Sequence, residues 1–176
     1  MKQGELGRLA RLFDKFKKRQ LQTDYPMYEG LNPILDHLIV KVINICEQEG
    51  MKVGKFCTFR SVEEQNSKYM RGRDSDGHII DKNKVITYVN GGNSWHQYGL
   101  AVDLVFYKDN YRWTWSMSPF EWNRLGAIGE SVGLTWGGRF SKMYDGPHFQ
   151  LTGNLKIGEA KDFYMKGGLL NVWDNI

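Results

Sequence analysis

The sequence predicts one α+β domain, a small antiparallel sheet flanked by helices. Its 176 residues are enough for one well-filled hydrophobic core and not comfortably enough for two. Capped helical segments stand beside short runs of strand-like residues. We therefore expect a single domain over residues 1–176 with its core in residues 31–151, and strands at residues 53–60, 100–107, 134–138 and 148–151.

The composition is that of an ordinary globular protein, with 41% hydrophobic and 25% charged residues. The net charge of +4 suits a protein that works beside a polyanion, such as nucleic acid, anionic lipid or an acidic cell-wall polymer. No nucleic-acid recognition motif is evident, so we do not expect a nucleic-acid partner. No apolar run is long enough for a signal peptide or a membrane span, and we expect synthesis in the cytoplasm.

Two helices are expected before the first strand, and the second of them is expected to contribute packing. Residues 1–22 place apolar side chains at helical spacing among basic ones, which predicts a short basic amphipathic helix. Such a helix can dock on the domain or contact an anionic surface, and both alternatives stay open. A second helix should begin at Asn32-Pro33 and end before Gly50. The two cysteines, Cys46 and Cys57, are interpreted as free buried thiols.

Arg60 follows the first predicted strand, and Ser61 to Glu64 form a capping box that opens a helix ending near Arg71. A guanidinium at such a corner can be a surface ion-pair partner or a functional group on a rigid scaffold.

Residues 72–93 form a long loop rich in Gly, Asp and Asn, with a β-like run at 85–89. Asp74 and Asp76 resemble the start of a calcium loop, but the full pattern fails. We interpret this segment as a solvated acidic turn in which His78 has no metal-ligand companion, and leave calcium binding open.

Asp103 is the anomaly of the sequence, since it lies in the middle of a strongly apolar strand. A buried carboxylate there needs a hydrogen-bonded partner or a cation. Gly99 allows the chain to bend so that His96 can return to the same side. The Asp103 carboxylate and the His96 imidazole are therefore candidates for one site.

Asp145 and His148 lie near the other end of the chain, where Pro147 stiffens the corner that sets the direction of His148. The helix before them, residues 118–132, begins with a capping box that accounts for Glu121. The tail, residues 153–176, predicts a helix with a Gly-Gly break and no chemistry.

Two imidazoles and a carboxylate make a catalytic zinc set when a fourth position is left to water. His96, Asp103 and His148 supply such a set, with Asp145 as the candidate carboxylate that takes the proton from water, and the spacing alone leaves this interpretation open. The alternative is two hydrogen-bonded histidines and an unrelated buried aspartate.

Ser94-Trp-His96-Gln-Tyr-Gly99-Leu-Ala101-Val-Asp103 resembles the Ser-x-His-x-x-Gly-x-Ala-x-Asp signature of zinc peptidases that cut peptidoglycan stem peptides. Every fixed position is matched. This family includes D-Ala-D-Ala carboxypeptidases and dipeptidases, and L-alanyl-D-glutamate endopeptidases found among phage endolysins.

The second family motif is an acidic residue three positions before a histidine, and Asp145 and His148 resemble it. Asp145 stands where many carboxypeptidases and dipeptidases carry Glu. The corner at Phe59-Arg60-Ser61 resembles the L-alanyl-D-glutamate branch. The resemblance covers about residues 31–151, leaving residues 1–22 and the loop at 73–84 without an assigned role.

The resemblance implies a D-Ala-D-Ala peptidase-like metallopeptidase fold with one catalytic Zn²⁺ held by His96, Asp103 and His148. Asp145 would activate water, and Arg60 would hold the substrate carbonyl or stabilise the oxyanion. The expected reaction is hydrolysis of the L-alanyl-D-glutamate bond by a monomeric enzyme that acts on peptidoglycan. The alternatives are a D-Ala-D-Ala carboxypeptidase and a non-catalytic zinc-containing wall-binding module.

The expected setting is a phage endolysin or another cell-wall hydrolase. Without a signal peptide the enzyme would reach the wall by another route, as phage endolysins do through a holin.

Overall fold

The computed structural model describes residues 30–108 and 112–176. The amphipathic helix expected over residues 1–22 lies outside this part of the chain. In the described ranges, no helix is both long and apolar enough to cross a membrane.

The predicted antiparallel sheet is confirmed. Its strand order is β1 (Val53–Cys57), β2 (Ala101–Lys108), β5 (His148–Gln150) and β4 (Thr135–Trp136), and β3 (Arg112–Thr114) also pairs with β2. All pairings are antiparallel. The central strand is β2, because it pairs with β1, β3 and β5. The β-like run at residues 85–89 is not a strand; a 3₁₀ turn, η1 (Lys82–Lys84), precedes it. Among the described residues no strand lies beside that run, and the side chains of Asp81 and Thr87 instead accept local hydrogen bonds from the backbone N–H groups of Asn83 and Val89.

Two helices and one face of the sheet enclose the main core. They are α2 (Pro33–Gln48) and α4 (Pro119–Ser131), each opened by the cap and Pro expected from the sequence. Along β2 the side chains alternate, so Val102, Leu104 and Phe106 face this core while Asp103 and Tyr107 face the other way. The sheet thus separates a dry side from a side that can carry chemistry.

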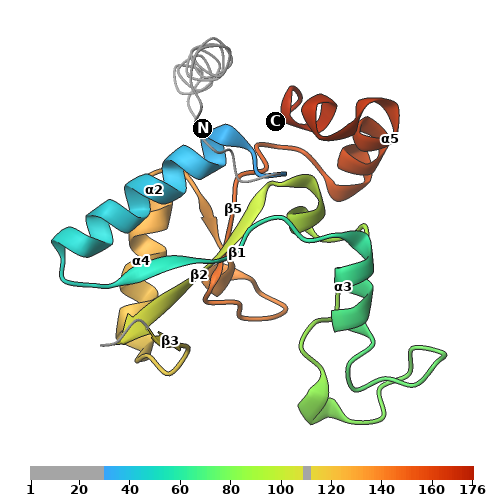
Figure 1. Cartoon of the computed structure of the whole chain (residues 1–176), viewed down its shortest axis with the longest axis horizontal. Helices are drawn as coiled ribbons and strands as arrows, with labels where there is room; N and C mark the ends of the chain where they lie inside the picture. Colours follow the sequence, from blue (N-terminus) through green and yellow to red (C-terminus); the bar gives the residue numbers. More distant parts are fainter. Residues whose placement is uncertain (1–29, 109–111) are drawn as a thin grey trace.

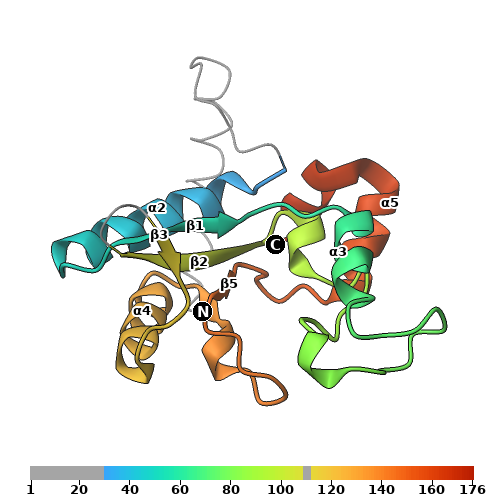
Figure 2. The ribbon, with the colours of Figure 1, turned by 60° about the horizontal axis from the view of Figure 1, so that its bottom comes forward.

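A second, smaller core lies at the other end of the molecule, where α5 (Ile157–Trp173) and α3 (Val62–Tyr69) stand away from β3 (Figure 1, Figure 2). The α5 helix packs against η2 (Trp95–Tyr98), and the indole of Trp173 donates to the Tyr98 carbonyl at 2.7 Å. The expected break is present at Gly167 and Gly168, and helix continues after it. The tail therefore supports the segment that carries His96.

Gly126 tests the packing between α4 and the sheet. A Cβ atom at Gly126 would lie 2.2 Å from the Trp136 ring, so we predict that Gly126→Ala destabilises the fold by about 2 kcal/mol, although alanine usually favours a helix. Gly158 is the matched control, because a Cβ there meets no atom within 4 Å among the described residues. Urea unfolding of both variants measures the difference; equal midpoints would contradict the packing.

Candidate metal centre

His96 is positioned by a short 3₁₀ helix with capping at both ends. Ser94 and Gln97 form its capping box, and Gly99 ends it in the left-handed region at φ +63°. A Cβ at Gly99 would lie 2.0 Å from the Gly30 carbonyl oxygen, so this bend requires glycine. The imidazole is buried, and its Nδ1 lies 2.7 Å from the Thr58 carbonyl. A donor at Nδ1 leaves Nε2 as the nitrogen that faces the site.

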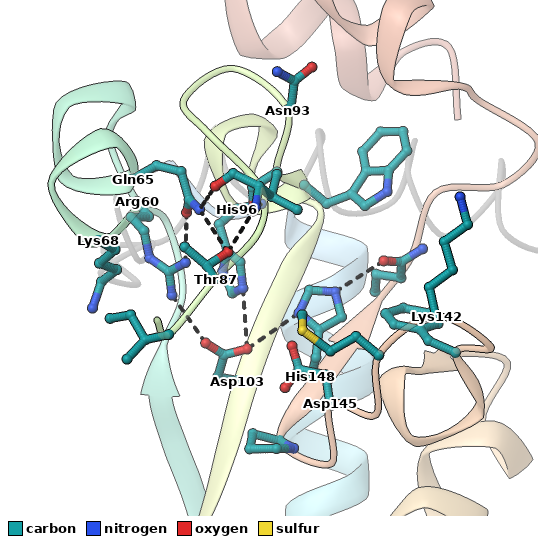
Figure 3. Close-up of a pocket in the computed structure, with 18 of the residues that line it drawn as sticks. Arg60, Gln65, Lys68, Thr87, Asn93, His96, Asp103, Lys142, Asp145 and His148 are labelled. Atoms are coloured by element: carbon teal, nitrogen blue, oxygen red, sulfur yellow. Dashed lines mark hydrogen bonds and ion pairs between the residues drawn. The ribbon is translucent and has the colours of Figure 1, made fainter. Parts of the chain in front are cut away.

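Strand register brings the other groups to His96. Asp103 in β2 lies directly opposite His148 in β5 and opposite Cys57 in β1. Because paired residues in antiparallel strands project from the same face, the three side chains converge. Distances confirm that the predicted ligands meet: Asp103 Oδ1 is 3.2 Å from His96 Nε2 and 3.4 Å from His148 Nδ1 (Figure 3).

Asp103 and each imidazole have the spacing of two ligands of one metal ion, whereas at this site the cluster of described residues whose ligand atoms all lie within 4.8 Å of one another is Cys57, His96 and Asp103. Bonds of about 2.0–2.2 Å in a tetrahedral site put ligand atoms about 3.4 Å apart, close to the separations between Asp103 and each imidazole. The outward nitrogen of His148, Nε2, lies 3.0 Å from Gln150 Oε1, as Nδ1 of His96 lies against Thr58. One nitrogen of each imidazole is thus fixed by a protein oxygen, and the other nitrogen is directed at the Asp103 carboxylate.

The charges of Asp103 and His96 strongly affect each other's pKa values. Burial alone would raise the pKa of Asp103, but the two imidazoles hold it well below its usual range. Burial alone would lower the pKa of His96, but the charge of Asp103 outweighs it and raises that pKa to about 10. Without a bound cation, the buried carboxylate is therefore compensated by a proton on His96.

Asp145 lies beside His148 and lines the same cleft (Figure 3). Its backbone N–H donates to the Gly137 carbonyl at 3.1 Å, and a Cβ at Gly137 would lie 2.5 Å from the Asp145 carbonyl oxygen. Burial raises the pKa of the Asp145 carboxyl, partly offset by His148. A partly buried carboxylate outside the His96–Asp103–His148 set is suited to accept a proton.

Arg60 holds the far side of Asp103. Its Nη2 donates to Asp103 Oδ2 at 3.2 Å and to Cys57 Sγ at 3.2 Å, and its Nη1 donates to Gln65 Oε1 at 2.8 Å. Gln65 is fixed in turn by donating to the Val89 carbonyl at 2.6 Å. Of the two interpretations left open by the sequence, the structure therefore places Arg60 at the site.

These groups lie in a cleft of about 1010 Å³. The sequence alone assigns no role in the site to several residues that line or adjoin the cleft: Cys57, the supporting amides of Gln65 and Gln150, and the basic side chains Lys68, Arg71 and Lys142. Both cysteines are free as expected and Cys46 is buried, but Cys57 is half-buried and its Sγ lies within 4.8 Å of ligand atoms of His96 and Asp103. Strand register would have identified Cys57, whereas nothing in the local sequence marks the amides or the lysines.

The acidic turn lies apart from this cleft. Asp74 Oδ1 accepts from the backbone N–H groups of Asp76 and His78, which is the geometry of a self-satisfied turn. The expectation that His78 has no companion is wrong, since its Nδ1 is 3.4 Å from Asp74 Oδ2. Asp76 and His78 are exposed, and the interpretation as a solvated turn accounts for them.

Comparisons with known proteins identify the family. A family model described as D-alanyl-D-alanine carboxypeptidase matches residues 88–151, which contain His96, Asp103, Asp145 and His148. The chain is 30% identical over 138 residues to the peptidoglycan L-alanyl-D-glutamate endopeptidase CwlK of Bacillus subtilis strain 168, covering 74% of this chain and 79% of that relative.

Solved structures share the fold. The L,D-carboxypeptidase DacB from Streptococcus pneumoniae gives a TM-score of 0.52 at 21% identity, covering 80% of this chain and 74% of that chain. VanYB in complex with D-alanine-D-alanine gives a TM-score of 0.50 at 18% identity, and the match covers 88% of this chain and 90% of that chain. The chain belongs to the family of peptidoglycan peptidases that contains D-alanyl-D-alanine carboxypeptidases and L-alanyl-D-glutamate endopeptidases.

Proposed function

We propose that this protein is a zinc metallopeptidase that hydrolyses the L-alanyl-D-glutamate bond of peptidoglycan stem peptides. The observation that carries the proposal is the buried convergence of His96 and His148 on Asp103, with Asp145 beside them in one cleft. The choice of bond is supported by the likeness to the endopeptidase of Bacillus subtilis. We place His96, Asp103 and His148 as ligands of a single Zn²⁺.

The chain's own groups divide the remaining work. A bound zinc ion supplies a Lewis acid and lowers the pKa of water to about 7. Asp145 accepts the proton at its carboxylate, whose pKa is raised by burial. Thr58 and Gln150 keep the two imidazoles in orientation through their outward nitrogens.

In this proposal Arg60 fixes the Asp103 carboxylate and also donates a hydrogen bond to the substrate. Three of its five N–H donors are directed to Gln65, Asp103 and Cys57, which fixes the carboxylate in place. Its Nε is buried and finds no acceptor among the described residues. One Nη1 hydrogen therefore remains for a substrate carbonyl or its oxyanion.

The main competitor is a D-Ala-D-Ala carboxypeptidase, since carboxypeptidases share the fold. Product mapping after digestion of purified peptidoglycan separates the two activities. The proposed enzyme exposes a new amino group on D-glutamate. Release of free D-alanine without that amino group would establish the competitor instead.

A non-catalytic zinc module is the alternative of another class, and Asp145 discriminates against it. We predict that Asp145→Ala retains zinc at wild-type stoichiometry and loses at least about 100-fold in hydrolysis, because a general base typically contributes 10²–10⁴-fold. His148→Ala should lose both zinc and activity. Metal analysis and turnover on purified peptidoglycan measure both quantities; wild-type turnover by the Asp145 variant would refute the assigned role.

Zinc binding should also release protons. Because the pKa of His96 is raised to about 10, its imidazole carries a proton at neutral pH that a metal ion must displace. We predict release of about one proton per zinc at pH 7 and an affinity that rises with pH. Calorimetry of the metal-free protein in two buffers of different ionisation enthalpy counts the protons. A count of zero with affinity independent of pH would contradict the coupling.

We also propose a biological setting, a phage endolysin or cell-wall hydrolase released through a holin. The positive net charge supports contact with an acidic wall, and residues 1–22 are the proposed anionic contact. Deleting those residues should weaken sedimentation with purified walls more than turnover on a soluble stem peptide. Unchanged sedimentation would remove their proposed role.

A further inference from the structure

Three large aromatic side chains, contributed by β1, β3 and the residue after β3, form an exposed cluster on one face of the sheet. Phe56, Trp113 and Trp115 are 52%, 43% and 46% exposed. Their rings are held edge to face, with Phe56 centroids 5.9 Å from Trp113 and 4.8 Å from Trp115. We refer to Phe56, Trp113 and Trp115 as the aromatic platform.

The aromatic platform lies on the same face of the sheet as the metal centre. Asp103 and Tyr107 are four residues apart on β2, so they project from one face, and Trp113 in β3 is paired with Tyr107. The Tyr107 and Trp113 rings lie 4.0 Å apart at 31°, which supports Trp113 from one side. Tyr107 itself lies across Gly54, where a Cβ would approach its ring to 2.5 Å. Trp113 is thus held in place rather than loosely exposed.

The aromatic platform is continuous with the substrate cleft. Phe56 and Trp115 line the cleft that contains Asp103 and His148. Four residues of strand span about 13 Å, which sets the scale between Asp103 and the Tyr107 end of the platform. An extended substrate that leaves the metal centre along this face reaches the rings.

We propose that the aromatic platform is a subsite for the pyranose ring of the amino sugar that carries the stem peptide. This rests on the proposed L-alanyl-D-glutamate activity. In peptidoglycan, L-alanine is joined to the sugar through a lactyl group, so two residue-sized units, about 7 Å, separate the scissile bond from the ring. The ring extends further, within the span between Asp103 and Tyr107.

The chemistry of the two surfaces matches. One side of a pyranose presents C–H bonds, which pack on the electron-rich face of an indole or phenyl ring. Two basic side chains of the cleft, Lys68 and Arg71, come from α3 and the turn after it, away from β3, and a third, Lys142, comes from the segment before β5. They suit the carboxylates of the peptide portion, which leaves the aromatic platform to the uncharged sugar. A D-Ala-D-Ala substrate would carry its sugar at the far end of the stem and place none here.

The test compares one stem peptide with and without its N-acetylmuramoyl group. We expect wild type to cleave the sugar-bearing substrate with the higher kcat/KM, and Trp115→Ala to lower that value about tenfold more than it lowers the value for the sugar-free peptide. Phe56→Ala should act in the same direction. Phe120→Ala is the matched control, because Phe120 is 78% exposed on α4 and does not line the cleft. Thermal unfolding of each variant establishes that it is folded.

The outcomes separate the subsite from the activity. Equal cleavage of the two substrates by wild type, or an equal loss on both in Trp115→Ala, would overturn the sugar subsite while leaving the peptidase intact. Cleavage of neither substrate by wild type would overturn the proposed activity and the subsite with it. Loss of binding to anionic vesicles in Trp115→Ala, with sugar discrimination retained, would assign the platform to a lipid surface instead.

Discussion

The structure depends on one electrostatic constraint, the carboxylate of Asp103 on the central strand, whose side chain is only 16% exposed. A charge removed from water must be compensated, and three cationic or cation-binding groups are arranged to do so. Arg60 holds Oδ2 from one side, and the imidazoles of His96 and His148 meet Oδ1 from the other. A proton on His96 and a metal ion are two ways of satisfying the same carboxylate, so metal binding and proton release are linked.

Each element of the fold can be understood by how it serves this carboxylate. β5 and β1 pair with β2 in the register that sets His148 and Cys57 opposite Asp103. The α5 helix supports the 3₁₀ segment that carries His96. The main core lies behind the sheet, leaving its other face to the cleft and the aromatic platform.

Local signals predicted a large part of this. Capping boxes and Pro marked the helix starts. The anomaly of Asp103 in an apolar strand marked the site, and the resemblance to zinc peptidases implied His96, Asp103 and His148 as the ligand set. The residues that were missed act through tertiary contact: Gln65 and Gln150 orient Arg60 and His148 from positions that carry no local pattern. The run at 85–89 misled because β propensity needs a partner strand, and among the described residues none lies beside it.

The central claim is that Asp103 organises the site around a cation. Metal analysis of wild type and Asp103→Asn, both shown to be folded, tests it most directly, because the amide keeps the shape and removes the charge. The account predicts one zinc ion per wild-type chain and a variant that binds almost none. Stoichiometric zinc in the variant, held as tightly as in wild type, would contradict it.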